Sequence, residues 1–400
     1  MSIRAGNKAE GDAFFNRDRE QEDFWRLISD NHVVLSGPRR LGKTSLLQRL
    51  ADTSEGQGWL AKLVDVQDVT DVAGFLDALD RAIPERTLWA WLKRQGDRTR
   101  AHLGRVRKVE VKAPDELGGA AAAVELAALP ATTWRERAEK LRIRLTKVPL
   151  LLLVDEFSVF LERLVTHDRD GAAVFLGWLR AWRLSDEVEC RFVFSGSIGL
   201  GALLERHDLE TVFNDCYDFQ LRPFSQRHAL NMLRDELEAE HWEHESGLLK
   251  FVCQRCGWLS PFYLNSLLLE ATRVALDRMD ELGDDRRLLT RDDVDGGYER
   301  LLQGRSRFSH WHKRLRRDLE PAEFEVAELV LAAICGSDEP LKRQHLLNRV
   351  RHASRGVEEP AFLLDRALIK LVEDGYVGLA SDGYGFLSFL LRDYWKRNHA

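Results

Sequence analysis

The chain has 400 residues, of which 44% are hydrophobic and 9% aromatic, so it is globular and long enough for two or three domains. Its net charge of −6 argues against a protein that coats nucleic acid uniformly. No apolar run is long enough to cross a bilayer, and the polar residues 1–12 lack a signal-peptide pattern. We therefore expect a cytoplasmic protein with no membrane partner.

The first predicted elements are a helix that ends near Ser29, a short buried strand over 32–36 and a helix over 44–51. The strand and the second helix flank a glycine-rich motif. This motif matches GxxxxGK[ST] and consists of Gly37, Pro38, Arg39, Arg40, Leu41, Gly42, Lys43, Thr44 and Ser45. A strand, this loop and a helix in succession predict a phosphate-binding loop.

The residue types in this loop suit nucleotide binding. Gly37 and Gly42 let the backbone curl so that successive N–H groups point at phosphate oxygens, and the start of the helix adds positive potential. Lys43 is placed to reach the β- and γ-phosphates, and the Thr44 hydroxyl to ligate Mg²⁺. We therefore predict that residues 37–45 bind ATP.

A strand over 59–66 and a helix over 69–83 follow, and the alternation of strands and helices is then interrupted over 86–131. Residues 86–112 hold nine Lys and Arg against two acids, a local net charge of +7. We interpret 86–131 as an arm inserted in the core. A solvated charged face is the favoured reading of this arm, and a nucleic-acid or partner-binding arm is the alternative.

A helix over 134–145 leads to the apolar strand 149–154, a pattern typical of a central parallel strand covered on both faces. This strand ends in Asp155 and Glu156, at the edge where such sheets bind ligands. We expect Asp155 to hold Mg²⁺ and Glu156 to polarise the attacking water. A further strand over 191–194 precedes Ser197, whose hydroxyl is placed to sense the γ-phosphate.

A helix over 171–182 and a last strand over 215–221 complete the pattern of a doubly wound α/β core with a parallel sheet, which we assign to residues 1–221. Helical patterns then continue to 302, and we assign 222–303 to a helical lid. Residues 304–320 predict a linker helix with one buried face and one basic face.

The last part, 321–400, predicts a winged helix-turn-helix. Its pattern is three helices, over 322–334, 341–350 and 360–373, followed by two strands, over 376–380 and 386–390. Residues 341–355 hold five Lys and Arg and no acid, whereas 356–375 hold five acids and two basic residues. Because helices that read a DNA groove are usually basic, DNA binding and contact with an unidentified protein both stay open.

The cysteines do not indicate a disulfide framework, since five is an odd number in a long chain. Cys253 and Cys256 form a lone CxxC, with His241 and His244 a little upstream. A zinc site made of these four residues is the less favoured interpretation, because no second CxxC supports it.

Taken together, GPRRLGKTSLL, LLLLVDEF, the FSGS after the next strand, the helical lid and the winged helix carry a resemblance. The chain resembles prokaryotic and archaeal AAA+-type ATPases of the signal-transduction (STAND) group, which are distant relatives of origin-recognition initiators. The resemblance runs from about residue 14 to the end. It implies that Phe15, Asn16 and Arg17 lie near the adenine and that Ser197 acts as the sensor. Arg206 stands where related ATPases often carry an arginine finger, although a plain surface arginine is the favoured interpretation.

The chain departs from this family in two places. The family's lid usually carries Gly-x-Pro against the base, whereas Gly257 and Pro261 are more widely spaced here. The sensor also lacks the Asn or Thr common in the wider class, which indicates slow hydrolysis. We predict an ATP-binding and hydrolysing regulatory switch with ATP or ADP and Mg²⁺ as ligands. The alternative is an ATP-licensed DNA-binding initiator or regulator, and a small-molecule kinase is disfavoured because the helical C-terminal half is too long for a lid.

Overall fold

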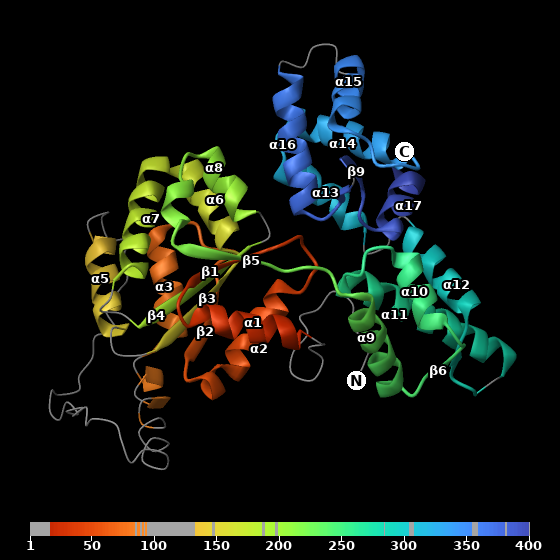
Figure 1. Cartoon of the computed structure of the whole chain (residues 1–400), viewed down its shortest axis with the longest axis horizontal. Coiled ribbons are helices and arrows are strands. Elements are labelled where there is room, and N and C mark those ends of the chain that lie inside the picture. Colours follow the sequence, from red (N-terminus) through yellow and green to blue (C-terminus); the bar gives the residue numbers. More distant parts are fainter. Residues whose placement is uncertain are drawn as a thin grey trace.

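The computed structural model of the chain describes residues 17–84, 86–88, 90–91, 93, 133–145, 149–185, 189–196, 199–283, 285–303, 308–353, 359–380 and 382–399. Three parts follow one another along the chain: an α/β core, a middle helical unit and a C-terminal unit (Figure 1). Within these described ranges, no helix is long and apolar enough to cross a membrane.

The core is built on one sheet of five parallel strands in the order β2-β3-β4-β1-β5. The strands are β1 (His32–Ser36), β2 (Leu60–Asp65), β3 (Leu150–Asp155), β4 (Cys190–Ser195) and β5 (Cys216–Gln220). Since all neighbours are parallel, the carboxyl ends of β1, β3 and β4 meet at one edge of the sheet. The predicted parallel α/β sheet is confirmed.

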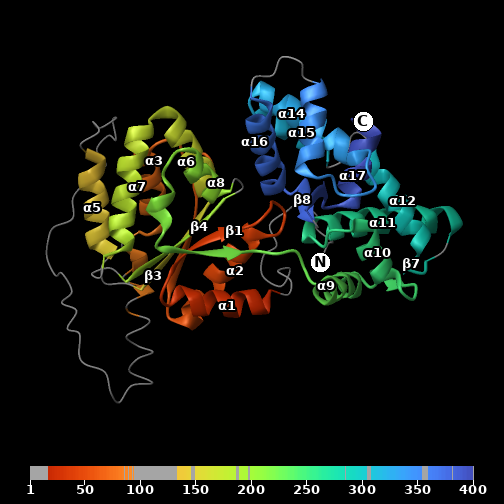
Figure 2. The ribbon, with the colours of Figure 1, turned by 45° about the horizontal axis from the view of Figure 1, so that its top comes forward.

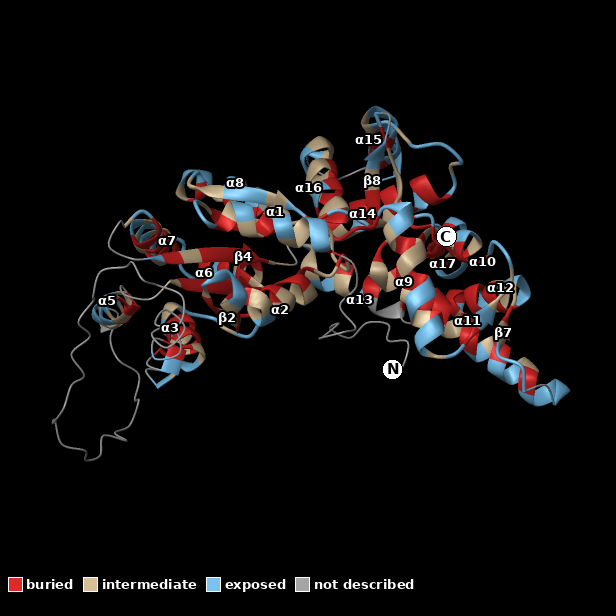
Figure 3. Cartoon of the chain, turned by 60° about the horizontal axis from the view of Figure 1, so that its bottom comes forward, coloured by how far each residue is buried: buried red, intermediate tan, exposed pale blue. Residues whose placement is uncertain are grey.

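Helices cover both faces of this sheet, and alternate residues of the internal strand β3 point to opposite faces. Leu151 and Leu153 belong to the apolar cluster of α1 (Asp18–Ile28) and α2 (Lys43–Thr53). Leu150, Leu152 and Val154 belong to the cluster of the other face. That face is covered by α3 (Val72–Ala82), α5 (Thr133–Leu145), α6 (Phe157–His167) and α7 (Arg169–Arg183). Buried residues concentrate where strands and helices face one another (Figure 3).

Shorter elements complete the core: η2 (Ser54–Gln57), α8 (Leu200–Arg206) and η3 (Glu210–Phe213). Helix α8 begins just after the loop that follows β4, so its start lies at the same sheet edge as the end of β1. The chain leaves the core after β5 and passes through Leu221 into the middle unit.

The middle helical unit contains α9 (Gln226–Ala239), β6 (Glu243–His244), α10 (Leu248–Cys256), α11 (Pro261–Leu282), β7 (Leu288–Leu289) and α12 (Arg291–Leu302). Local signals fix the starts of its helices. The Ser225 hydroxyl accepts from the backbone N–H of His228, and Thr290 and Asp293 form a capping box. Pro261 occupies the first turn of α11, where its missing N–H costs nothing. These helices match the helical pattern predicted for 222–303.

The C-terminal unit follows the linker helix α13 (Ser309–Asp318). It consists of α14 (Pro321–Cys335), α15 (Arg343–Ala353), α16 (Pro360–Glu373), β8 (Val377–Ala380), β9 (Gly383–Phe386) and α17 (Phe389–Asn398). Three helices and a two-stranded antiparallel hairpin thus occur in the order predicted for a winged helix. In both ribbon views α16 lies on the side of this unit that faces the core (Figure 1 and Figure 2).

The predicted strand over 386–390 is wrong, because the hairpin turns earlier than expected. Asp382 has a φ of 67°, and Gly383 already pairs with Ala380. A Cβ on Gly383 would lie 2.7 Å from the carbonyl oxygen of Pro340, so this position requires glycine. The following residues form α17 instead, with apolar side chains buried at helical spacing; these are Leu390, Leu391, Tyr394 and Trp395.

Candidate functional site

The loop between β1 and α2 has the backbone conformation that its glycines permit. Gly37 has a φ of 130° and Gly42 a φ of 88°, both in the region that favours glycine. A Cβ on Gly37 would lie 2.6 Å from the carbonyl oxygen of Leu221. The N-terminus of α2 has no side-chain cap. Such a helix start suits an anion.

Lys43 lies inside this loop and is almost fully buried. Its Nζ donates to the carbonyl oxygens of Gly37 at 2.6 Å and Pro38 at 3.2 Å. Burial lowers the pKa of Lys43 to about 8, and the negative charges of Glu156 and Asp155 act in the opposite direction. The loop therefore holds a desolvated cation that a phosphate group would neutralise.

Thr44 and Asp155 meet as the sequence predicts for a metal site. The Thr44 Oγ1 donates to Oδ2 of Asp155 at 2.6 Å, and Asp155 is only 3% exposed. The other carboxylate oxygen, Oδ1, accepts from the backbone N–H of Glu156 at 3.0 Å. Hydroxyl and carboxylate oxygens are the ligands that Mg²⁺ prefers, so this pair fits the ion that the sequence predicts.

Glu156 stands at the start of α6 with a φ of 57°, in the left-handed region. Such a backbone is uncommon for a residue other than glycine, and strained residues of this kind gather at functional sites. Arg40, at a φ of 69°, is a second case in the same site. The carboxylate of Glu156 is close enough to Lys43 to influence its pKa. Glu156 therefore lies at the sheet edge beside the loop, as predicted.

The predicted sensor and part of the predicted adenine contact lie outside the described residues: Ser197, Phe15 and Asn16. The inserted arm over 86–131 also lies almost wholly outside them. Just before Ser197 the structure places Ser195, the last residue of β4, and Gly196. The Ser195 hydroxyl is buried without a hydrogen-bond partner in the described parts of the chain, and a Cβ on Gly196 would lie 1.9 Å from Oγ of Ser158.

Arg17 connects the loop between β1 and α2 to the segment that follows β5. Its guanidinium donates to the carbonyl oxygens of Leu41 at 2.9 Å and Arg222 at 2.8 Å, and it also pairs with Glu20. It lies 4.6 Å from the ring centroid of Phe224. Burial lowers the pKa of Arg17. Arg17 thus contacts the loop, and a role beside the adenine stays a prediction.

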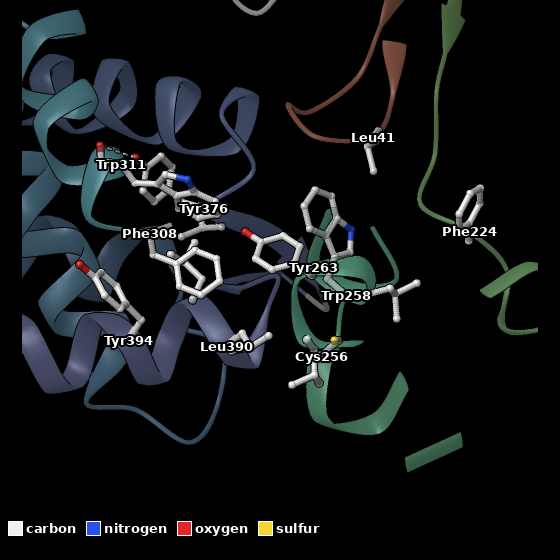
Figure 4. Packing of buried hydrophobic residues seen from close by; sticks show 14 of the residues in the cluster. Leu41, Phe224, Cys256, Trp258, Tyr263, Phe308, Trp311, Tyr376, Leu390 and Tyr394 are labelled. Carbon is white, nitrogen blue, oxygen red and sulfur yellow. Dashed lines mark hydrogen bonds between the residues drawn. The ribbon is translucent and has the colours of Figure 1, made fainter. Parts of the chain in front are cut away.

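Arg40 points away from the sheet and into the middle unit and α13. Its guanidinium carbon lies 3.3 Å from the ring centroid of Trp311 in α13 and 4.2 Å from that of Phe262 in α11. The carbonyl oxygen of Arg40 accepts from Oγ of Ser260 at 2.7 Å. Burial lowers the pKa of Arg40 to about 10. The aromatic side chains around Trp311, among them Tyr263 and Phe308, form one aromatic cluster with edge-to-face contacts (Figure 4).

Arg39 points into the C-terminal unit. Its Nε lies 2.8 Å from Oδ1 of Asp374, and its Nη2 lies 3.9 Å from Oδ2 of Asp318 at the end of α13. The Nζ of Lys370 lies 3.7 Å from both acids. We call these four residues the charge cluster. Their side chains are 2% to 14% exposed, so the core loop, the linker helix and α16 share one buried set of charges.

The residues beside Asp374 extend this contact in both directions. Glu373 accepts from the backbone N–H of Gly199, at the start of α8, and burial raises the pKa of Glu373 to about 7. A Cβ on Gly199 would lie 2.0 Å from Oε1 of Glu373. A Cβ on Gly375 would lie 3.2 Å from Cβ of Pro38. The end of α16 therefore contacts both loops at the carboxyl edge of the sheet.

Sequence reasoning missed these partners. The acids at 373 and 374 stand at the end of an amphipathic helix and belong to no motif, and the middle positions of GxxxxGK[ST] accept any residue. Arg206 lies 3.8 Å from Glu162 within the core, and both side chains are about one-third exposed. Within the described residues no group of three or more His, Cys, Asp and Glu side chains could hold a metal, and Cys253 and Cys256 are buried free thiols.

The whole chain was compared with family models, curated protein sequences and solved structures. No family model matches the sequence, and no curated protein sequence matches it. Among solved structures, the Walker-type ATPase PABY2304 of Pyrococcus abyssi is similar with a TM-score of 0.66 at 14% identity, over 99% of this chain and 100% of that chain. The Aeropyrum pernix ORC2 protein, solved as ADPNP–ADP complexes, is similar with a TM-score of 0.57 at 13% identity, over 98% and 96%.

At such low identities these likenesses show the fold alone. The fold is that of the P-loop ATPases of the AAA+ type, as the sequence resemblance implied. The neighbours are an archaeal Walker-type ATPase and an archaeal origin-recognition protein, and both are matched over nearly their whole length.

Proposed function

We propose that this protein binds and hydrolyses ATP with Mg²⁺ and acts as a regulatory switch, in which the bound nucleotide sets the arrangement of the lid and a winged helix. In this proposal the middle helical unit is the lid and residues 321–399 form the winged helix. The observation that carries this proposal is the pair of contacts that Arg39 and Arg40 make outside the core. These side chains belong to the predicted phosphate loop, yet Arg39 pairs with Asp374 of the C-terminal unit and Arg40 contacts Trp311 of α13.

The chemistry assigned to the site follows from its donors and acceptors. The uncapped start of α2 and Lys43 neutralise and orient the phosphates. A magnesium ion, when bound by Thr44 and Asp155, supplies further charge neutralisation. Glu156 accepts a hydrogen bond from the attacking water and orients it, and Ser197 takes the sensor role. The ion pair between Arg206 and Glu162 agrees with a surface role for that arginine.

A switch needs two arrangements of similar free energy, and the described contacts leave room for a second one. Three buried polar atoms in the aromatic cluster around Trp311 have no hydrogen-bond partner in the described parts of the chain. They are Nη1 of Arg40, the Tyr263 hydroxyl and Nε1 of Trp311. Unpaired buried groups each cost about 1–3 kcal/mol. An arrangement that opens this region to water would regain those interactions.

Small-angle scattering of the Glu156→Gln protein tests this proposal, because that variant should hold ATP without turning it over. We expect a larger radius of gyration with ATP and Mg²⁺ than with ADP. Identical scattering curves under saturating ATP and ADP would contradict the switch, and failure to bind either nucleotide would contradict the site itself.

A DNA-binding regulator is the second candidate, and the surface of α15 favours it. Lys342, Arg349 and Arg351 are exposed along this helix and its approach, and none of the three forms an ion pair with a described residue. Helix α16 is less suited to DNA, since it exposes Phe362 and Ile369. A gel shift of the full chain at rising salt tests this candidate, and a shift that Arg349→Ala and Arg351→Ala together abolish would support it. An unidentified protein is the alternative binding partner of the C-terminal unit.

A further inference from the structure

The end of α16 inserts between the two core loops that the proposed function uses to read the nucleotide. We call Glu373, Asp374 and Gly375 the acidic turn. Glu373 accepts from Gly199 on the side of the loop after β4, and Asp374 pairs with Arg39 on the side of the phosphate loop.

Gly375 lets the turn fit at this place. It has a φ of 75°, and a Cβ there would lie 3.1 Å from the Trp258 ring and 3.2 Å from Cβ of Pro38. A larger residue would strain the backbone and push against both neighbours. Gly375 therefore lets the turn approach both neighbours more closely than a residue with a side chain could, and it also ends α16.

The negative charges of the acidic turn disfavour a phosphate group at the neighbouring loop. Asp374 is 2% exposed at its side chain and lies against Arg39, two residues after Gly37 in the phosphate loop. Nucleotide phosphates at that loop would place further negative charge beside Asp374 and Glu373. Like charges in a poorly solvated site repel one another strongly, and phosphates also attract Arg39. The turn and the phosphates thus compete for the same cation.

The contact between Asp374 and Arg39 is one that phosphates can displace. Neither carboxylate oxygen of Asp374 accepts a hydrogen bond from a described residue, although both lie within ion-pair distance of a cation. A buried ion pair without hydrogen bonds recovers little of the cost of desolvating its charges. Lys370 stays paired with Asp318 when Arg39 leaves, so the remaining charges are not orphaned.

We infer that the acidic turn is an internal competitor of the nucleotide: it holds Arg39 and Gly199 in the arrangement described here, and ATP and the turn weaken each other's binding to the core loops. This inference rests on the proposed function, because it takes residues 37–45 as the phosphate site. Since such coupling is reciprocal, ATP releases the end of α16 to the same extent that the turn weakens ATP binding.

Calorimetric titration of the full chain with Mg·ATPγS tests the inference. Asp374→Asn keeps the shape of the turn and removes its charge, and we expect affinity to rise about five- to tenfold, the lower range of typical coupling between sites. The matched control is Asp365→Asn, which removes the partner of Arg343 within the same unit. We expect that control to stay within twofold of the wild-type affinity.

A double variant tests whether the effect of Asp374 on nucleotide affinity depends on Arg39. In an Arg39→Gln background the further change Asp374→Asn should raise affinity by less than it does in the wild-type chain, because competition for the cation is gone and only the repulsion between carboxylate and phosphates remains. If Asp374→Asn alone does not fold, as judged by its thermal unfolding, Glu373→Gln is titrated at pH 8, where the wild-type Glu373 carboxyl is ionised, and its loss should also tighten binding.

The outcomes separate this inference from the function on which it rests. Wild-type protein that fails to bind ATPγS at millimolar concentration would defeat both. Wild-type protein that binds it, with Asp374→Asn equal or weaker, would overturn the inference alone and leave the nucleotide site standing.

Discussion

At the scale of single residues, Lys43 matters most, because it is the cation that the loop buries against its own carbonyl oxygens. We expect Lys43→Ala to abolish ATP binding, since the alanine leaves no side-chain charge at the β- and γ-phosphates. Lys250→Ala, on the exposed side of α10, is the control. Titration calorimetry measures both, and an affinity of Lys43→Ala within threefold of wild type would rule out the phosphate-loop assignment.

Glu156 is the residue whose replacement separates binding from turnover. We expect Glu156→Gln to retain ATP but to hydrolyse it about 100-fold more slowly, the usual scale for a positioned base. Glu162→Gln removes a carboxylate on the same helix and serves as the control. Phosphate release measures the rate. Normal turnover by Glu156→Gln would mean that another residue orients the water.

Glu373 makes the contact between core and C-terminal unit dependent on pH. Its pKa is raised from 4.5 to about 7 by burial, with Lys370, Arg206 and Asp374 as the charged neighbours. Between these values the docked carboxyl keeps its proton and the undocked one loses it, so docking weakens as pH rises through this window. Well above pH 7 the Glu373 carboxyl is ionised in both the docked and the undocked state, so it causes no further change in the free energy of docking.

Urea unfolding at pH 5.5 and pH 8 checks this expectation against Glu373→Gln. The wild-type chain should lose more unfolding free energy on going to pH 8 than the glutamine variant does, because the variant carries no titratable group there. Glu162, whose pKa is also raised, is present in both proteins and cancels in the comparison. Parallel pH dependences for the two proteins would contradict the assignment.

The predicted residues and the missed ones differ in how far apart their partners lie in the sequence. Thr44 and Asp155 were predictable together, because each ends or begins an element with a recognisable pattern at one sheet edge. The partners of Arg39 were not. Asp374 lies 335 positions further along the chain (374 − 39), and only tertiary packing brings it to the loop.

At the scale of elements, α13 connects the phosphate loop to the C-terminal unit. The predicted apolar face is buried, with Phe308, Trp311 and Leu315 at 0% to 5% exposure. It packs on two neighbours, since Phe308 stacks on Tyr263 of α11 and lies against Tyr394 of α17. This helix therefore touches both units that the switch is proposed to move.

We expect Trp311→Ala to uncouple the units while leaving ATP binding within threefold of wild type. A buried cation–aromatic contact such as that of Arg40 on Trp311 contributes about 2 kcal/mol, and its loss frees α13 from the loop. Trp178→Ala, in the core helix α7, is the control for loss of a large ring. Hydrogen exchange of α13 measures the effect. An ATP-dependent change that survives in Trp311→Ala would contradict this role.

Element prediction failed where two elements follow each other without a strong break. Helix α6 begins immediately after Asp155 and Glu156, and it was not among the elements predicted from the sequence. Helix α17 was mistaken in part for the second hairpin strand, because a two-residue turn at Asp382 started β9 early. The five strands of the sheet, bounded by turn residues, were predicted within a few positions.

At the scale of the whole molecule, one apolar cluster runs from the face of α1 and α2 through the middle unit into the C-terminal unit. The charge cluster lies beside this apolar cluster, and the basic residues of α13 do not supply its contact with Asp374. Arg314 and Arg317 pair instead with Asp318 of their own helix, and Arg39 of the core takes Asp374. The phosphate loop itself therefore joins the three parts.

Hydrogen exchange across residues 305–400, with and without ATP and Mg²⁺, tests the switch most directly. The contacts of Arg39 and Arg40 predict that ATP lowers protection at the end of α16 and in α13, while α14, packed inside its own unit, keeps its protection. Equal protection of all these peptides in both conditions, with ATP shown to be bound, would mean that the C-terminal unit is a fixed appendage and that this account of the molecule is wrong.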